Sequence, residues 1–271
     1  MPELPEVETI RQQLLPELPL HITATRYSDN ISGILKTRMF SPRNKTIQQI
    51  SRKGKLLDFI LSDGTHIISG LGMSGGWRIS SASIREKHTH IQFTCRNPGG
   101  LIYLAYVDPR RFGKCHFIDE AGANDILNRL GADVSSEAFT SAYVAAVCHK
   151  HSTREIKPLL LDQSCFAGVG NYIACEVLAH AGIHPTRCAG SLNSHEHRRM
   201  VSAMKLVLSG SLQKRGLTFS GGYSDAYGNS GNALDNLVVF HQRICGLCEQ
   251  TEVVRTTIQG RGTYFCPRCQ T

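Results

Sequence analysis

Two Cys-x2-Cys pairs near the end of the chain restrict its fold more than any other sequence feature. The pairs are Cys245 with Cys248 and Cys266 with Cys269, and 17 residues separate them. Pairs at this spacing place four thiolates around one tetrahedral Zn²⁺, each pair on its own tight turn. Because cysteine fills all four positions, none is left for water, and we expect a structural zinc. Redox-active cysteine pairs and chance spacing are the alternatives.

The segment between the two pairs is predicted to form a β-hairpin. Val253–Thr257 forms one arm, Gln259–Phe265 completes the hairpin, and Arg261 lies near its tip. An arginine presented on a zinc-braced hairpin is suited to contact a phosphate. The alternative is an ordinary surface arginine.

The other six cysteines are scattered singly through apolar segments: Cys95, Cys115, Cys148, Cys165, Cys175 and Cys188. Such residues are typical of small buried side chains in a reducing compartment. No apolar run reaches the roughly 18 residues that a membrane span requires, and the start is unlike a signal peptide. We therefore expect a protein of the cytosol with access to the nucleoid.

The 271 residues are expected to form an α+β protein with three parts. A short leading helix over 5–15 precedes β-type runs at 56–61, 65–68, 89–94 and 101–107, with Gly- and Asn-rich turns between them, which predict a β-sandwich or barrel. From about residue 122 the apolar period becomes helical. The expected parts are a β domain over 1–120, a helical domain over 121–236 and a finger over 237–271. Residues 216–236 are Gly/Ser/Asn-rich, which predicts a long functional or disordered loop.

The charge of the chain favours an acidic partner. The formal net charge is +8, and residues 36–55 hold seven lysines and arginines with no acidic residue. Such a stretch repels itself unless something anionic faces it. A solvated basic surface is the equally open alternative.

The N-terminal residues offer nucleophilic chemistry. Removal of Met1 would expose the secondary amine of Pro2, and an α-amino group is roughly one tenth neutral at pH 7. Glu3 adjoins it, and Glu6 lies in the first turn of the predicted helix, where a carboxylate suits the helix dipole. An amine with a carboxylate beside it can form a carbinolamine and then an iminium at a sugar carbon.

Several segments together resemble the bacterial formamidopyrimidine-DNA glycosylase family, and they occur in the family's order along the whole chain. They are Pro2-Glu3-Leu4-Pro5-Glu6-Val7-Glu8-Thr9, Gly72-Met73-Ser74-Gly75, Asp108-Pro109-Arg110-Arg111-Phe112-Gly113, Gly168-Val169-Gly170-Asn171 and the terminal cysteine pairs. The resemblance implies an N-terminal β-sandwich, a helix–two-turn–helix module in the second domain and a β-hairpin zinc finger.

The resemblance also implies a mechanism. Pro2 would attack C1′ of a damaged nucleotide, and Glu3 would act as acid and base at the sugar. Lys55 matches the lysine that assists β-elimination, and Arg261 matches the finger arginine assigned to δ-elimination and phosphate binding. Lys55 could instead be one more solvated charge of the basic run.

A base inside a duplex cannot be reached, so such an enzyme must flip the nucleotide and fill the gap. The family's three gap-filling side chains correspond to Met73, Arg110 and Phe112; core packing is the alternative for Met73 and Phe112. Asn171 matches the asparagine of the helix–two-turn–helix module, and its helix N-terminus is suited to grip a phosphate. The remaining matches to DNA-contacting positions are His88 and Lys157, each of which could instead be structural.

Some positions depart from the purine-specific branch. Gly70 stands where histidine usually precedes Leu-Gly-Met, and Asn171-Tyr172-Ile173 reverses the commoner order. The 216–236 loop, expected to cover the flipped base, lacks the usual lysine near its start. Leu159–Gln163 and Val239-Phe240-His241 are closer to the endonuclease VIII branch, which prefers oxidised pyrimidines.

We therefore expect a monomeric, zinc-containing enzyme of base-excision repair that acts on double-stranded DNA. Its expected activity is removal of oxidised purines, such as 8-oxoguanine and formamidopyrimidines, followed by AP lyase cleavage. The alternatives are the same chemistry on oxidised pyrimidines, or a zinc-finger DNA-binding lesion sensor without catalysis.

Overall fold

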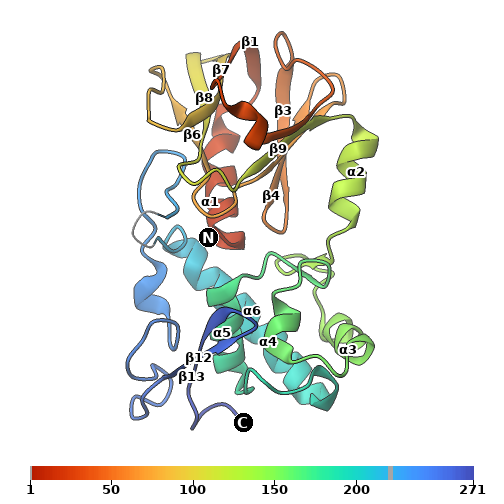
Figure 1. Ribbon diagram of the computed structural model, residues 1–271, viewed down its shortest axis with the longest axis vertical. Helices are drawn as coiled ribbons and strands as arrows, with labels where there is room; N and C mark the ends of the chain where they lie inside the picture. The colour runs from red at the N-terminus through yellow and green to blue at the C-terminus, as the bar shows by residue number, and fades with distance from the viewer. Residues whose placement is uncertain (1, 219–221) are drawn as a thin grey trace. The chain divides into compact units, whose positions relative to one another are not determined.

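The computed structural model describes residues 2–218 and 222–271, and the chain divides into two compact units (Figure 1). Unit 1 comprises residues 1–129 and 214–232, and unit 2 comprises residues 130–213 and 233–271. The expected processing of Met1 and part of the loop predicted over 216–236 therefore lie outside the described residues.

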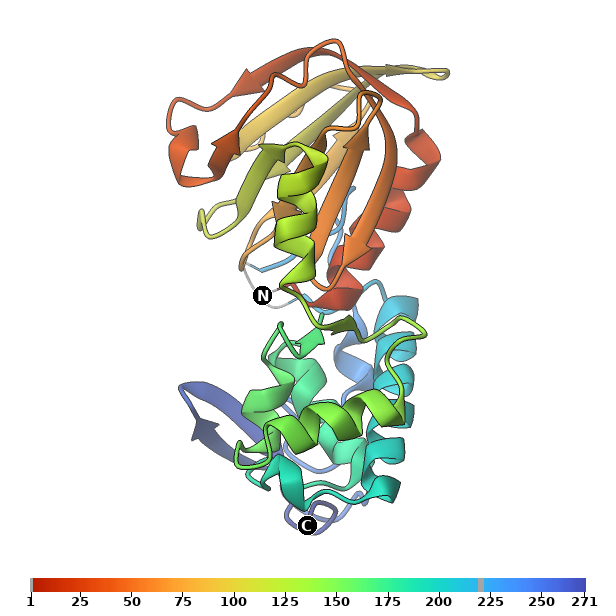
Figure 2. The same cartoon turned by 90° about the vertical axis from the view of Figure 1, so that its right-hand side faces the viewer.

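This division differs from the boundaries predicted at residues 120 and 236. The helix α2 (Glu120–Asn128) belongs to unit 1 because Ala123 packs against Ile68 and Ile118 of the sheet; Figure 2 shows this yellow-green helix on the outer face of the strands. Residues 214–232 also group with unit 1, and the cysteine-containing segment groups with unit 2.

Unit 1 begins with helix α1 (Leu4–Leu14), which confirms the predicted leading helix. The strands that follow are β1 (Leu20–Tyr27), β2 (Leu35–Arg38), β3 (Thr46–Lys53), β4 (Leu56–Leu61), β5 (His66–Gly70), β6 (Gly76–Ser80), β7 (Thr89–Asn97), β8 (Gly100–Val107) and β9 (Lys114–Ile118). Within the described residues they form one sheet of nine strands in the order β2-β9-β5-β4-β3-β1-β7-β8-β6. Only the pairing of β2 with β9 is parallel in this sheet, as far as the described residues extend.

The sheet folds over itself into the predicted β-sandwich, because strands that are distant in its order meet in the core. The Phe59 ring on β4 lies 4.9 Å from the Trp77 ring on β6, measured between centroids. Trp77 lies 5.9 Å from Phe93 on β7, which in turn lies 6.2 Å from Phe117 on β9. Val7, Ile10 and Leu14 of α1 complete this buried cluster. Aromatic side chains bury the most apolar area each, so this cluster dominates the stability of unit 1.

Unit 2 is helical, as predicted. Its elements are β10 (Ala132–Asp133), α3 (Ser141–Lys150), α4 (Ile156–Leu160), β11 (Phe166–Ala167), α5 (Asn171–Ala181), α6 (Ser194–Gln213), the 3₁₀ turn η4 (Ala233–Asn236) and the hairpin strands β12 (Val254–Ile258) and β13 (Arg261–Phe265). Gly182 ends α5 in the left-handed conformation at φ 68°, which glycine adopts without steric cost. Asn193 and Glu196 form the predicted capping pair, because the Asn193 side chain accepts from the Glu196 N–H at 3.1 Å and the Glu196 carboxylate accepts from the Asn193 N–H at 2.8 Å.

No helix among the described residues is both long enough and apolar enough to span a membrane.

Candidate functional site

The N-terminal end of α1 holds Pro2 and Glu3 in a fixed, buried position. Glu3 is the N-cap residue of α1, and it forms a reciprocal capping box with Glu6. The Glu6 Oε2 atom accepts from the Glu3 backbone N–H at 2.6 Å, and the Glu3 and Glu6 residues are 3% and 1% exposed. A buried charge-assisted hydrogen bond of this kind is stronger than a neutral one. The helix start therefore fixes the backbone that directly follows Pro2.

Glu6 also ties the 214–232 segment to α1, which the sequence did not reveal. Its second oxygen, Oε1, accepts from the Leu217 N–H at 2.7 Å. Gly216 adopts φ +80°, and a Cβ on it would lie 2.6 Å from Glu6 Oε1, so only glycine fits here. Farther along the segment, Ala226 N–H donates to Gln13 Oε1 at 2.8 Å. The segment that follows α6 is thus docked on the helix that carries Pro2.

Lys55 lies in the two-residue turn between β3 and β4. Lys53 pairs with Leu56 across the turn, and Gly54 adopts φ +59°, which suits the first central position of a type II′ hairpin turn. Arg52 donates to the Gly54 carbonyl at 2.9 Å and to the Glu8 carboxylate of α1 at 2.9 Å. The turn that carries Lys55 is therefore anchored to the same helix as Pro2 and Glu3.

The Glu8 carboxylate at this anchor is held in its charged form. Burial alone would raise the pKa of Glu8, but hydrogen bonds from Arg11 and Arg52 and the positive charges of both hold it below its ordinary value. Arg11 NH2 lies 2.7 Å from Glu8 Oε1. The sequence does not reveal this ion pair, because Arg52 lies 44 residues from Glu8 along the chain.

The three predicted gap-filling residues stand on two loops that are locked together. Asp108, which is fully buried, accepts from Ser74 Oγ at 2.7 Å and from Gly113 N–H at 2.8 Å. Ser74 Oγ in turn accepts from the Arg110 N–H at 3.1 Å. Asp108 therefore joins the loop that carries Met73 to the loop that carries Arg110 and Phe112.

Close backbone contact reinforces this pairing of loops. Gly72 adopts φ +64°, and a Cβ on it would lie 2.5 Å from the Phe112 carbonyl carbon. Phe112 is 53% exposed, and the Arg110 guanidinium lies 5.2 Å from the centre of its ring. Phe112 therefore stands outside the core, on a loop whose backbone is held by close contact with Gly72. Because Phe112 is exposed, the core-packing alternative does not describe it, whereas Met73 is partly buried and that alternative stays open.

His88 is exposed beside these loops, and its carbonyl accepts from the Asp108 N–H at 3.1 Å. Its neighbour His90 is buried, with Nε2 3.1 Å from the Asp108 carbonyl and Nδ1 3.0 Å from Ser28 Oγ. Burial lowers the pKa of His90. His90 therefore braces the loop, whereas His88 is available to a ligand.

In unit 2 the structure brings Lys157, Asn171 and the hairpin together. The Lys157 ammonium donates to Asn171 Oδ1 at 2.9 Å, and Asn171 Nδ2 donates to the Gly262 carbonyl at 2.8 Å. Arg261 is exposed at the start of β13, directly after the turn at Gln259 and Gly260, both of which have positive φ. Lys157, predicted to contact DNA, is 0% exposed. Its side chain orients Asn171, which contacts the hairpin that presents Arg261.

The four finger cysteines are arranged to hold a metal ion. Their sulfur atoms all lie within 4.8 Å of one another. Cys245 Sγ lies 4.0 Å from Cys269 Sγ, and Cys248 Sγ lies 3.8 Å from Cys266 Sγ. Tetrahedral zinc with Zn–S bonds of about 2.3 Å requires sulfur separations of roughly 3.8 Å, so the geometry fits that ion. Gln270 braces the site, since its side chain accepts from the Cys266 N–H at 2.8 Å and donates to the Ile183 carbonyl at 2.9 Å.

Two family models match most of the chain. The formamidopyrimidine-DNA glycosylase N-terminal domain matches residues 1–115, and the formamidopyrimidine-DNA glycosylase H2TH domain matches residues 130–221. The chain is also 36% identical over 280 residues to a formamidopyrimidine-DNA glycosylase of Enterobacter sp. (strain 638), with both chains fully covered.

The chain belongs to the formamidopyrimidine-DNA glycosylase family.

Other members of this family agree in sequence and fold. The enzyme of Geobacillus kaustophilus is 37% identical over 280 residues, with both chains fully covered. The crystal structure of the MutM (Fpg) protein from Thermus thermophilus matches with a TM-score of 0.86 at 33% identity, covering 99% of this chain and 98% of that one. The Lactococcus lactis Fpg (MutM) protein, in complex with a Fapy-dG containing DNA, matches with a TM-score of 0.86 at 30% identity, covering 99% of this chain and 100% of that one.

Proposed function

We propose that this chain removes oxidised purines from duplex DNA and then cleaves the strand, with Pro2 as the attacking nucleophile. The observation that carries the proposal is the start of α1, where the buried Glu6 carboxylate fixes the backbone of Glu3, directly after the buried Pro2. Family membership makes the chain a DNA glycosylase of base-excision repair. The proposals below concern which lesion the enzyme removes, which residues act in catalysis and DNA binding, and which metal ion the finger holds.

The proposed first step uses Pro2 and Glu3. Once Met1 has been removed, the Pro2 nitrogen attacks C1′ of the flipped nucleotide, and the bond from C1′ to the damaged base breaks. Glu3 protonates O4′ so that the sugar ring opens, and the resulting iminium joins Pro2 to C1′. A secondary amine suits this step, because it forms a positively charged iminium with C1′. The iminium can then accept electrons when the C2′ proton is removed during the later elimination.

Elimination then cleaves the backbone. The iminium acidifies the C2′ proton, and its removal expels the 3′ phosphate, a β-elimination that we assign to the assistance of Lys55. Arg261 assists δ-elimination of the 5′ phosphate, and water finally releases Pro2. Charge-assisted contacts of lysine and arginine with phosphate support these assignments, as does the anchoring of the Lys55 turn to α1 by Arg52 and Glu8.

DNA binding is proposed to use the exposed groups of both units. Met73, Arg110 and Phe112 fill the gap that the flipped nucleotide leaves, the arginine pairing with the orphaned base. His88 and Asn171 contact phosphates, and Lys157 acts by orienting Asn171. The finger ion is proposed to be Zn²⁺ in a structural role, and we propose that the protein acts as a monomer in the bacterial cytoplasm.

The preference for purines is supported by the names of the relatives and by the Lactococcus lactis complex with a Fapy-dG containing DNA. A preference for oxidised pyrimidines is favoured by Gly70 and by the Asn171-Tyr172-Ile173 order. Excision rates on matched duplexes with 8-oxoguanine or thymine glycol separate the two. We expect faster excision of 8-oxoguanine, and the reverse order would refute the purine assignment.

The nucleophile is tested by borohydride trapping on a duplex with one lesion. The parent protein is expected to form a covalent complex, and Pro2→Gly is expected to lose most of it while still binding abasic-site DNA. Full trapping by Pro2→Gly, or no trapping by the parent protein, contradicts the assignment. Intact mass spectrometry of the same sample excludes the non-catalytic lesion sensor if Met1 is absent.

A further inference from the structure

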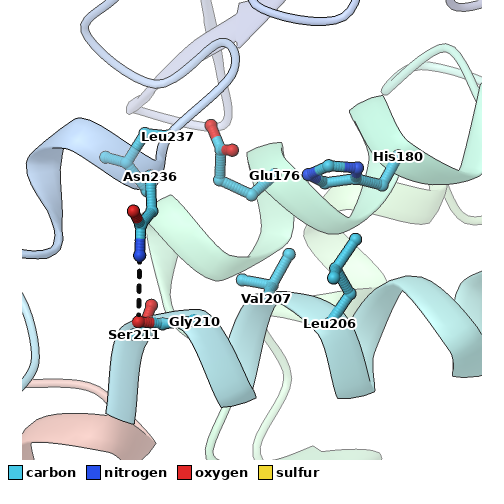
Figure 3. Close-up of a pocket in the computed structure, with 8 residues that line it drawn as sticks. All are labelled: Glu176, His180, Leu206, Val207, Gly210, Ser211, Asn236 and Leu237. Carbon is cyan, nitrogen blue, oxygen red and sulfur yellow. Dashed lines mark hydrogen bonds between the residues drawn. The ribbon is translucent and has the colours of Figure 1, made fainter. Parts of the chain in front are cut away.

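Two neighbouring cavities of about 290 and 410 Å³ form a continuous groove between α5 and α6, since both are lined by His180 and Leu206. We call this the α5–α6 groove. The first cavity is also lined by Glu176 and Val207, and the second by His195, Arg198 and Arg199. Figure 3 shows Glu176 and His180 on α5 across the first cavity from Leu206 and Val207 on α6.

The second cavity is lined by two arginines, Arg198 and Arg199. The Arg198 guanidinium lies 3.0 Å from His195 Nδ1, a partner that does not neutralise it. Arg199 donates through Nε to the Ala181 carbonyl at 2.7 Å, and its side chain is 52% exposed. The Glu196 carboxylate pairs with Arg187 at 2.5 Å and with Arg199 at 3.8 Å, so one carboxylate is shared between two arginines. Arg198 and Arg199 therefore face solvent with charge that an anionic ligand can neutralise.

The first cavity is lined in part by apolar side chains, Leu206 and Val207 among them. Leu206 is 58% exposed, whereas Val207 beside it is buried. The Glu176 carboxylate in this cavity accepts from the backbone N–H groups of residues 238, 239 and 240 at 2.7, 3.0 and 2.7 Å, so its charge is directed toward the chain and away from a ligand. An exposed leucine over a cavity favours an apolar side chain of a ligand.

The groove is separate from the DNA-binding residues proposed in unit 2. On α5, Glu176 and His180 line the groove, and they lie five and nine residues from Asn171, which corresponds to roughly 8 and 14 Å along the helix axis. A nucleic acid needs cations along its whole track, whereas here the two arginines line only the second cavity.

We propose that the α5–α6 groove binds a short acidic peptide segment of a partner protein that ends in an apolar residue. The peptide carboxylates lie over Arg198 and Arg199, and the apolar side chain enters the first cavity against Leu206. This assignment follows from the two arginines of the second cavity, the apolar side chains of the first and the volume of each. A helix-pair groove of this kind would attach the enzyme to another protein without occupying its DNA-binding residues.

The test uses the full-length protein and a fluorescein-labelled peptide of four aspartates followed by leucine and phenylalanine. We expect saturable binding by fluorescence anisotropy that weakens as salt rises. Arg198→Ala with Arg199→Ala is expected to weaken binding about tenfold, since each exposed ion pair contributes modestly. Leu206→Asp is expected to weaken it at least as much. Excision by these variants should equal that of the parent protein.

Two controls distinguish an effect of the groove arginines from an effect of the protein's overall charge. Lys150→Ala with Lys205→Ala removes the same charge from residues that do not line the groove, and it should leave peptide affinity within about twofold. A peptide with asparagine in place of aspartate should bind at least about tenfold more weakly. Melting curves of each variant check that the helices remain folded.

The proposal fails if the aspartate peptide shows no saturable binding, or if the control pair weakens it as much as the groove pair. It also fails if the groove variants lower affinity for undamaged duplex DNA and not for the peptide, because the groove would then be a nucleic-acid contact.

Discussion

The Glu6 carboxylate connects the start of α1 to the segment after α6, and Glu6→Gln tests how much this connection stabilises unit 1. The carboxylate accepts from Glu3 N–H through Oε2 and from Leu217 N–H through Oε1, at 2.6 and 2.7 Å. A glutamine oxygen can serve only one of these donors, and its NH₂ group would face the other.

The magnitude follows from these contacts. One charge-assisted hydrogen bond becomes neutral, and one buried N–H loses its acceptor, which costs about 1–3 kcal/mol. Together the two changes should lower the free energy of unfolding of unit 1 by about 2–4 kcal/mol. The expected loss is large because Glu6 is only 1% exposed and water cannot replace the lost acceptor.

The single tryptophan makes the assay specific to unit 1. Trp77 is completely buried in the sandwich core, so its fluorescence during urea titration reports the unfolding of this unit. Glu120→Gln is the matched control, because Glu120 is exposed in the first turn of α2 and the same change should cost less than about 0.5 kcal/mol. A loss below about 0.5 kcal/mol for Glu6→Gln would refute the reasoning. We also expect slower borohydride trapping by this variant, because Glu6 fixes the backbone of Glu3.

Three further predictions concern other parts of the site. Glu8 has a lowered pKa in the folded state, so its stabilising contribution is complete above the unfolded pKa of about 4.3 and is lost as the pH falls through the folded value. The difference in unfolding free energy between the parent protein and Glu8→Gln, followed by Trp77 fluorescence, should therefore be constant at neutral pH and shrink in acid. A difference that grows in acid would contradict this. Lys157→Met should lower the free energy of unfolding of unit 2 by about 1–3 kcal/mol and weaken the binding of abasic-site DNA, because Asn171 loses its buried donor. An unchanged melting temperature and an unchanged DNA affinity, measured by fluorescence anisotropy, would contradict this prediction. Metal analysis should find one zinc per chain, and its removal by a chelator should abolish strand cleavage while leaving Trp77 fluorescence unchanged; full cleavage by metal-free protein would show that the finger ion is dispensable.

The local features of the fold could be predicted from the sequence because each depends on neighbouring residues. The end of α5 at Gly182 follows from the freedom of glycine at φ 68°, and the capping of α6 follows from the three-residue spacing of Asn193 and Glu196. The cysteine cluster likewise follows from two local turns and one hairpin.

The features that the sequence did not predict depend on contacts between distant residues. Glu6 reaches Leu217 across 211 residues, which is why the segment after α6 groups with unit 1 and not with the helices that precede it. The burial of Lys157 follows from its bond to Asn171, whereas its sequence surroundings show only a lysine near a proline. Asp108 was recognised as part of a motif, but its role in joining two loops depends on Ser74, which is 34 residues away.

Peptide mapping of the borohydride-reduced complex tests the central claim most directly. After digestion of a complex formed on lesion-containing duplex, we predict that the sugar remnant is attached to the nitrogen of Pro2 in the N-terminal peptide. A remnant attached to Lys55 or to any other lysine, with an unmodified N-terminal peptide, would contradict the account.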